Sequence, residues 1–464
     1  MLLIIIQKYI LLVYLVYMLI RGVMMNKWFK RLFFGLIMVL ITVGYTYYFR
    51  LLVDDELYNF GFSFNIIQGL IPYKDFNMIV PPLFSYLLAG FFLLFGCHLL
   101  VYHFVIAIMI VFIFFISYRS FGNWAFIIYL LLLIYPYTGY NIFALFLLFL
   151  LFYLKDRDDF CFWEPILISM MFLTKQTLGL LVIPSLIYSK NKKKTIAVYL
   201  IFIFSFLLYL VWNGMVFQFF DYCLFGMFDF ASENSTSFNF LLLIEIFIIL
   251  VLGYLCYVTK RKDYFFCLMF QIMALPIVNC VHFVISFIPV VYLFLEKYRD
   301  NRYVLFLCFV GVCSFFIGFN GSLFIKDSHY KSISYYDRDN FMSGRVIYNI
   351  TENYIDKAKE YVDLYEGYNV YFFGSFAYMM KLNCGIPITK YDIINDGNMG
   401  YHGDFRYIKE IDDYCEENKC LFIINDHEGD DSSVSQTNIR ILDYVKDNYY
   451  QVYSSNIFSV YINS

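Results

Sequence analysis

Long runs of apolar residues, separated by short polar connections, fill the first two thirds of the chain. A run of about 20 residues that is apolar on every side predicts a membrane-spanning helix. Between Leu32 and about Phe319 the runs predict about eleven such helices, one of them over 265–280. The pattern then becomes polar and alternates between helix and strand periodicity, which predicts a small α/β domain. Its expected helices are 352–365, 404–417 and 436–447, and its expected strands are 369–374, 420–426, 450–455 and 457–464.

Composition supports a membrane protein. The chain has 464 residues, of which 61% are hydrophobic and 15% charged, and its mean hydropathy is +0.65. A soluble domain contains about 25% charged residues. We therefore expect a multi-pass protein of the plasma (cytoplasmic) membrane. The net charge of -3 indicates no partner, because the charges are sorted by membrane side, and we expect no nucleic-acid partner.

The distribution of basic residues gives the orientation. Lysine and arginine cluster in short connections, which the positive-inside rule assigns to the cytoplasm; these lie at 21–31, 155–159, 190–194, 259–263 and 296–302. Four apolar stretches precede the connection at 155–159 after the first crossing, and four crossings would put that connection on the wrong side. The stretch Pro81–Gly96 opens with two prolines and allows about 15 helical residues, or roughly 22 Å against a hydrocarbon core of ~30 Å. We expect it to lie in the outer interface.

The chain thus divides into three parts. Residues 25–324 are the expected transmembrane domain, with a first outer loop at 51–97. Because the crossings leave the chain outside, residues 325–464 are the expected extracytoplasmic α/β domain. Residues 1–24 are a further apolar segment, which could be an extra helix, a signal anchor or sequence upstream of a true start at Met24 or Met25.

A dense acidic triplet, Asp54, Asp55 and Glu56, follows the first crossing. Such carboxylates could simply cap a helix at the interface, or they could supply a catalytic base or a metal ligand. The residues that follow resemble the first outer loop of GT-C glycosyltransferases, the superfamily of protein O-mannosyltransferases and lipid A aminoarabinose transferases, and above all their bacterial mannosyltransferase-like members. The shared pattern is an acidic pair, a G-x-x-P-Y-x-D-F turn, a Pro-Pro-Leu helix start and a Phe-Gly end, here Asp55-Glu56, Gly69–Phe76, Pro81–Leu83 and Phe95-Gly96.

This resemblance covers about residues 27–323, with strong motifs only at 54–96. It implies a GT-C-like fold that transfers a sugar from a polyprenyl-phosphate donor in the membrane lipid to an envelope glycan, lipid or protein. Asp55 matches the catalytic carboxylate, Asp54 is the alternative register, and Glu56 stands beside them. Some members hold a divalent metal at this carboxylate, so Asp55 is also the candidate metal ligand, and we expect no other cofactor. The matched turn makes Tyr73, Lys74 and Asp75 candidates for a substrate loop.

Two further positions are candidates for the donor phosphate. Lys175 and Gln176 lie between two short apolar helices, where a lysine is costly unless it snorkels or has a partner. Related proteins have Lys-Gln at such a turn, which implies phosphate binding. His282 lies before a membrane helix, where relatives have Arg or His, and it is otherwise a structural histidine. The family mechanism leads us to expect Asp55, Lys175 and His282 around one outer cavity.

Other polar residues in apolar surroundings have weaker signals. Glu245 falls within an apolar run, where an acid is a functional candidate, and Asp221 and Asp229 could supply a second outer carboxylate. Two other protein classes share this architecture, namely polysaccharide polymerases or ligases and transporters of envelope precursors. The early acidic pair disfavours the first class, and the lack of internal repeats disfavours the second.

The outer domain also contains cysteines. Of the 11 cysteines in the chain, three lie beyond residue 325, and an odd number there allows one disulfide. The candidates are Cys384, Cys415 and Cys420.

Overall fold

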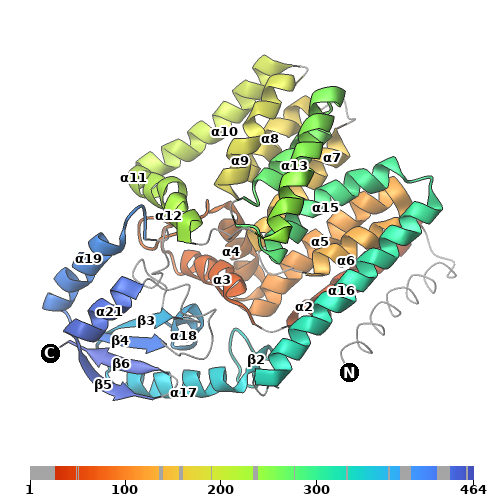
Figure 1. The fold of residues 1–464 in the computed structure, drawn as a ribbon. Coiled ribbons are helices and arrows are strands. Elements are labelled where there is room, and N and C mark those ends of the chain that lie inside the picture. The colour runs from red at the N-terminus through yellow and green to blue at the C-terminus, as the bar shows by residue number, and fades with distance from the viewer. Residues whose placement is uncertain are drawn as a thin grey trace. The chain divides into compact units, whose positions relative to one another are not determined.

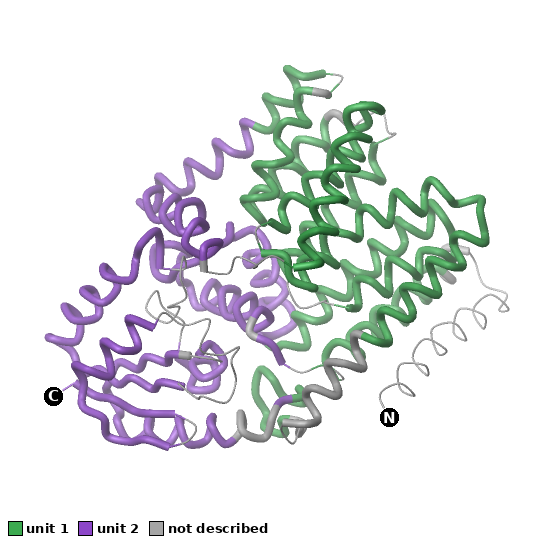
Figure 2. Tube along the Cα trace, in the orientation of Figure 1, with its two compact units in different colours: residues 1–51, 98–199, 236–346 green, residues 52–97, 200–235, 347–464 purple. Residues whose placement is uncertain are grey.

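The computed structural model forms two compact units, each built from segments that are distant in sequence (Figure 2). Unit 1 comprises residues 1–51, 98–199 and 236–346, and unit 2 comprises residues 52–97, 200–235 and 347–464. The expected N-terminal segment 1–24 falls outside the described residues. The structure describes residues 27–48, 50, 52–134, 139–155, 160–189, 191–233, 239–275, 277–330, 333–374, 377–386, 399–425, 439–455 and 458–463.

Unit 1 is a bundle of apolar helices (Figure 1). Its helices are α2 (Lys27–Tyr48), α5 (Leu99–Phe121), α6 (Phe126–Ile134), α7 (Gly139–Leu154), α8 (Phe160–Phe172), α9 (Gln176–Val182), α13 (Phe240–Thr259), α14 (Lys262–Ile272), α15 (Cys280–Lys297) and α16 (Arg302–Tyr330). Short 3-10 helices cover Gly122–Ala125 and Ile183–Tyr188, and two strands, β1 (Ile333–Tyr335) and β2 (Val346–Tyr348), follow α16. Helix α10 (Lys192–Trp212) begins in this unit and continues into unit 2.

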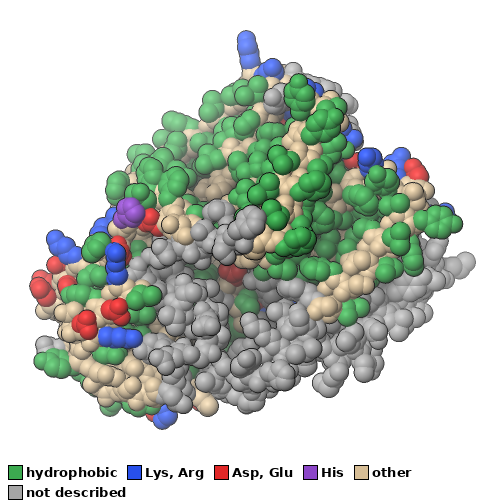
Figure 3. Space-filling view, in the orientation of Figure 1, with side chains coloured by type: hydrophobic (Ala, Val, Ile, Leu, Met, Phe, Trp, Pro, Cys, Tyr) green, Lys and Arg blue, Asp and Glu red, His purple; other side chains and the backbone are tan. Residues whose placement is uncertain are grey.

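Five segments in the described residues are long and apolar enough to span a membrane. They are Arg31–Tyr48, Leu99–Ile134, Lys192–Trp212, Phe240–Thr259 and Cys280–Lys297. Hydrophobic side chains accordingly cover the visible face over α10 and α13 in Figure 3. Five further apolar helices are shorter, with 10–17 residues. The predicted multi-pass helical architecture is present, whereas the number of eleven crossings stays a prediction.

The run expected to cross the membrane at 265–280 has a different structure. Helix α14 begins at Lys262 and ends at Ile272 after 11 residues, and the described residues between Met273 and Asn279 are not helical. At 1.5 Å per residue such a helix is roughly 16 Å long, which is well short of the ~30 Å hydrocarbon core. Apolar composition therefore overestimated the length of this helix.

Helices α2 and α5 run antiparallel, which settles where the chain leaves and re-enters unit 1. Phe34 near the start of α2 contacts Phe114 near the end of α5, with ring centroids 6.2 Å apart. At the other end the ring of Tyr47 lies 6.1 Å from that of His98. Residues 52–97 therefore leave and return at the same end of unit 1, as the crossing count required. Helix α4 (Leu83–Phe95), the expected interfacial helix, lies in that excursion and has only 13 residues.

A hairpin after α16 closes this end of unit 1, which we call the outer end. The backbone carbonyl of Phe341 accepts a hydrogen bond from the Leu99 amide at 2.8 Å, and the Tyr47 hydroxyl donates to the Ser343 carbonyl at 2.6 Å. The buried guanidinium of Arg345 donates to the Tyr47 carbonyl at 2.7 Å and also to the Arg50 carbonyl. A cation at the last carbonyls of a helix complements the helix dipole, so Arg345 fixes the end of α2.

Unit 2 combines outer-loop helices with an α/β sheet. Its outer-loop helices are α3 (Asp54–Ile67), α4, α11 (Val216–Phe219), a π-helix (Phe220–Phe225) and α12 (Gly226–Glu233). The sheet is flanked by α17 (Asn349–Leu364), α18 (Ala377–Asn383), α19 (Asp404–Glu417) and α21 (Ile439–Asn448). Its strands are β3 (Asn369–Gly374), β4 (Cys420–Asn425), β5 (Tyr450–Ser454) and β6 (Ser459–Ile462), in the order β3-β4-β6-β5, and only the β3–β4 pair is parallel.

The helices α17, α19 and α21 and the four strands of the sheet lie within three residues of the boundaries predicted for them. Helix 404–417 matches at both ends. Helix α16 continues to Tyr330, past the expected boundary at 324, and the division into a transmembrane and an extracytoplasmic domain stays a prediction. The C-terminal elements also form one unit with the first outer loop. Tyr378 of α18 packs edge-on against Tyr58 of α3, with ring centroids 4.4 Å apart. The disulfide joins Cys415 to Cys420, and Cys384 is a free thiol.

Candidate functional site

The acidic triplet opens α3, four residues after Arg50, rather than capping the end of α2. Acids in the first turn of a helix are favoured by the positive end of the helix dipole. Asp55 is half-buried, and its backbone carbonyl accepts a hydrogen bond from the side-chain amide nitrogen of Asn59 at 2.6 Å. Glu56 is fully buried. The side chain of Asp54 lies outside the described residues, so the choice of register between Asp54 and Asp55 stays a prediction.

The motif turn after α3 is held by its own side chains. Gly69 has φ +86°, and Tyr73 adopts φ +69°, a left-handed conformation that is uncommon for a tyrosine. The Tyr73 amide donates to the Phe76 carbonyl at 2.8 Å, and a carboxylate oxygen of Asp75 accepts from the Ile71 amide at 2.7 Å. Tyr73 is buried, while Lys74 is exposed. Of the three expected substrate-loop residues, Lys74 is therefore the one with a side chain open to solvent.

Tyr73 also connects this turn to the segment 216–233. Its hydroxyl donates to the Val80 carbonyl at 2.8 Å and accepts from the thiol of Cys223 at 3.2 Å. Burial, with a further contribution from Cys223, raises the pKa of Tyr73 well above its ordinary value. Tyr73 consequently remains protonated and cannot serve as a base near neutral pH.

The two candidate second carboxylates, Asp221 and Asp229, bind the segment before α19. Asp221 accepts from the Tyr401 amide at 3.1 Å and from the Arg406 guanidinium at 2.7 Å. Asp229 accepts from the His402 amide, and the His402 ring lies 3.3 Å from its other oxygen. We call these contacts the carboxylate clamp. Its members are committed to holding residues 401–406, so the structure gives Asp221 and Asp229 a positioning role.

Lys175 is positioned by the hairpin of α8 and α9, as the sequence predicted. It immediately precedes α9, and its ammonium donates to the side-chain oxygen of Asn141 at 2.8 Å and lies 5.6 Å from the centre of the Tyr140 ring. Asn141 is in the first turn of α7, where the Gly139 amide binds the hydroxyl of Tyr102 in the first turn of α5. Lys175 therefore lies at the outer end of unit 1. Its neighbour Gln176 is buried.

His282 lies in the first turn of α15. Asn279 caps this helix by accepting from the His282 amide at 2.9 Å, and its side-chain oxygen lies 3.1 Å from Nδ1 of His282. Lys175 and His282 both belong to unit 1, whereas Asp55 belongs to unit 2. Whether all three line one cavity stays a prediction.

Several polar residues of unit 1 escaped the sequence analysis. Asn141 gave no signal because a lone asparagine in an aromatic stretch is common. Arg50 is buried and donates to the Ile134 carbonyl at 2.8 Å, so it fixes the end of α6 as Arg345 fixes that of α2. The position of Arg50 just before the acidic triplet was a usable signal. Glu245, a weaker candidate, is fully buried, and its carboxylate oxygens have no hydrogen-bond partner among the described residues.

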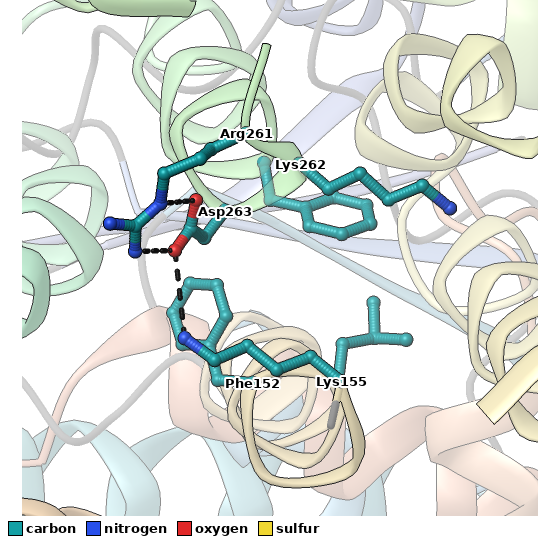
Figure 4. Close-up of a pocket in the computed structure, with 7 residues that line it drawn as sticks. Phe152, Lys155, Arg261, Lys262 and Asp263 are labelled. Carbon is teal, nitrogen blue, oxygen red and sulfur yellow. Dashed lines mark hydrogen bonds and ion pairs between the residues drawn. The ribbon is translucent and has the colours of Figure 1, made fainter. Parts of the chain in front are cut away.

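The opposite end of unit 1 contains a pocket of about 330 Å³ between charged side chains (Figure 4). Asp263 pairs with Arg261 and lies 3.5 Å from the Lys155 ammonium, which also binds Glu296 at 3.1 Å. Beside them Lys262 binds the buried Glu164 at 2.6 Å. The pocket is lined by these three cations and Asp263, and among the described residues the cations also pair with Glu296 and Glu164. We call this the ion-paired end.

Metal binding has no further support in the described side chains. No group of three His, Cys, Asp or Glu residues among them could hold a metal ion. A divalent metal at Asp55 stays a prediction.

No protein-family profile and no curated protein matches the chain. Solved structures do. ArnT from Cupriavidus metallidurans bound to undecaprenyl phosphate shares 12% identity, covering 93% of this chain and 98% of that one, with a TM-score of 0.57. The apo state of the same protein gives 11% identity, the same coverage and the same TM-score. The Archaeoglobus fulgidus oligosaccharyltransferase in complex with Zn and sulfate shares 14% identity over 93% of this chain and 73% of that one, with a TM-score of 0.47.

The likeness to ArnT extends over almost the whole of both chains. At 12% identity it establishes the fold. ArnT is a GT-C lipid A aminoarabinose transferase. The chain therefore has the fold of a GT-C membrane glycosyltransferase, as the motifs at 54–96 indicated.

Proposed function

We propose that this chain is a glycosyltransferase that moves a sugar from a polyprenyl-phosphate donor to an acceptor outside the cytoplasm. The observation that carries the proposal is the likeness to a structure of ArnT bound to undecaprenyl phosphate over 93% of the chain. The motif residues of the first outer loop, together with Lys175 at the outer end of unit 1, support it.

Lys175 would bind the donor phosphate. Its ammonium donates to the side-chain oxygen of Asn141 at 2.8 Å, which orients the charge. A lysine is a strong point-charge partner for phosphate, and His282 in the first turn of α15 would offer a ring nitrogen as a hydrogen-bond partner. Together they would offset the negative charge that develops on the phosphate as the sugar leaves.

Asp55 would act as the general base. It opens α3 at the membrane rim, where a carboxylate meets a water-borne acceptor without being desolvated in the bilayer. In the transfer the acceptor oxygen bonds to the anomeric carbon, the bond from that carbon to the phosphate oxygen breaks, and the acceptor proton passes to Asp55. The products are the glycosylated acceptor and the polyprenyl phosphate.

The disulfide Cys415–Cys420 supports an extracytoplasmic location for the C-terminal elements. It joins the last turn of α19 to the first residue of β4 inside the hydrophobic core of the sheet. Disulfides persist in oxidising compartments and are rare in the cytoplasm. An acceptor on that side of the membrane, whether glycan, lipid or protein, would therefore meet unit 2.

The test is a transfer assay with the purified full chain in lipid nanodiscs. The protein is incubated with polyprenyl-phosphate sugars and envelope extract, and released polyprenyl phosphate and modified acceptor are measured by mass spectrometry. We expect stoichiometric release and transfer by the natural chain and by Lys262→Met, which changes only the ion-paired end. Envelope glycans and glycoproteins of cells with and without the gene identify the acceptor. Unchanged envelopes together with no release from any donor would refute the proposal, and movement of an intact donor across the bilayer would favour a transporter.

A further inference from the structure

Exposed aromatic side chains gather in unit 2 on both sides of the carboxylate clamp. Phe225 and Phe228 of the segment 216–233 are 51% and 66% exposed, and Tyr401 and Phe405 at the start of α19 are 46% and 67% exposed. The contact of His402 with Asp229, the neighbour of Phe228, joins the two groups. We call these four residues the aromatic surface. Contiguous exposed apolar patches on a protein surface often mark sites of contact with other proteins or with membranes.

The charged groups around the aromatic surface are already matched. The His402 ring lies beside Asp229, Arg406 binds Asp221, and Arg440 binds Asp404 at 2.7 Å while its guanidinium stacks on Phe405. The two arginines at this surface, Arg406 and Arg440, are each paired with a carboxylate, so its exposed feature is the aromatic rings rather than an open cation.

The course of the chain indicates what covers these rings. The segment 216–233 follows directly from α10, which is long and apolar enough to span a membrane. Trp212, the last residue of α10, is 90% exposed, and tryptophan is enriched where spans meet the headgroup layer. Only Asn213, Gly214 and Met215 separate α10 from α11. The segment ends at Glu233, and α13, which is also long and apolar enough to span a membrane, begins seven residues later at Phe240, so both ends of the segment lie close in sequence to a candidate span.

We propose that the aromatic surface rests in the headgroup layer of the leaflet at the Trp212 end of α10 and contacts phospholipid. The carboxylate clamp then holds the start of α19 at the membrane. The C-terminal sheet that α19 flanks would thus be attached to the membrane through Tyr401 and Phe405 as well as through its covalent connection to α16. Aromatic rings are well suited to this layer because they combine an apolar body with a polar or polarisable edge. The proposal concerns lipid contact and does not depend on sugar transfer.

Photocrosslinking of the full chain in nanodiscs tests it. Phe228, Phe405 and, as the control, Tyr450 are replaced one at a time by benzoylphenylalanine. Tyr450 on β5 is 66% exposed, which matches Phe405, but it lies outside the aromatic surface. After irradiation in phosphatidylcholine, we expect the intact mass at positions 228 and 405 to rise by one phospholipid, and no such rise at 450. Because the surrounding charges are matched, adding anionic lipid should leave the yields unchanged.

Other products would overturn the proposal. A lipid adduct at 450 equal to that at 405 would show non-specific labelling, and crosslinks at 405 only to a second copy of the chain or to envelope glycan would assign the surface to those partners. Positions 228 and 405 lie on separate segments, so the test still gives a result if one of the two variants misfolds. Gel filtration of each variant checks its fold.

Discussion

The cations at the two ends of unit 1 bind different kinds of partner. At the ion-paired end, Lys155, Arg261 and Lys262 bind carboxylates and line a pocket with Asp263. At the outer end, Lys175 donates to the side-chain amide oxygen of Asn141, and Arg345 donates to the backbone carbonyls at the end of α2. The carboxylate pairs of the first end contribute to structure, whereas the role proposed for Lys175 is to offset charge on the donor phosphate.

A topology experiment addresses the comparison most directly, because its outcome is all or none. A reporter enzyme that is active only outside the cytoplasm is fused after Ser464 and, separately, within 190–194. We expect activity only from the first fusion, since the basic connections remain in the cytoplasm. Activity from the second fusion would place the ion-paired end outside and exchange the roles of the two ends.

The next largest effect is expected at Asp55, which follows the outer end of α2. Asp55→Asn keeps the size of the side chain but cannot accept a proton, so transfer should fall about 100-fold or more. Thermal stability should change little, because a charge in the first turn of a helix contributes about 1 kcal/mol or less. Asp54→Asn is the matched control and should keep most activity.

Steady-state rates in the nanodisc assay and a melting curve measure both quantities for Asp55. Full activity of Asp55→Asn would rule out its role as base. Inactivity of Asp54→Asn alone would keep the mechanism but move it by one residue.

Lys175 and Lys262 form a matched pair of lysines at opposite ends. Lys175→Met should raise the KM for the donor about 10- to 100-fold, because a hydrogen bond to a charged group is worth about 1.5–3 kcal/mol. Lys262→Met should leave that KM unchanged but lower the melting temperature, since it removes the cation from the buried Glu164. Donor titrations give the KM of each variant, and melting curves give the melting temperature of each. If both changed KM equally, the distinction between the ends would be lost.

The smallest effect concerns acid stability at the ion-paired end. Burial would raise the pKa of Asp263, but the hydrogen bond and charge of Arg261 together with the charge of Lys155 lower it below its ordinary value. The stability contributed by a carboxyl with a lowered pKa is present above its unfolded pKa of about 4 and is lost as the pH falls through the folded value. Asp263→Asn should cost about 1 kcal/mol at pH 7, because Arg261 is half exposed and solvent screens the pair.

Melting temperatures of the natural chain and Asp263→Asn are compared from pH 7 down to pH 3, a range chosen around the carboxyl pKa of about 4. The two curves should approach each other as the pH falls below that value. A constant separation would show that the Asp263 pair does not link folding to protonation.

The sequence by itself determined the local elements of this protein. Helix 404–417 and strand 369–374 were predicted at both ends, because periodicity and turn residues act within a few positions. The turn at Lys175 was predicted for the same reason. The antiparallel course of α2 and α5 followed from counting crossings, which is a global argument but needs only the positions of charges.

Tertiary structure alone decided the pairings between distant residues. Asp221 binds Arg406, 185 positions away in the sequence, and the Cys223 thiol donates to the Tyr73 hydroxyl, 150 positions away. No local sequence pattern predicts either contact. Arg345 looked like an ordinary residue of a polar loop until the hairpin brought it to the end of α2. Local preferences cannot encode such contacts, because a buried polar side chain takes its role from the partner that folding supplies.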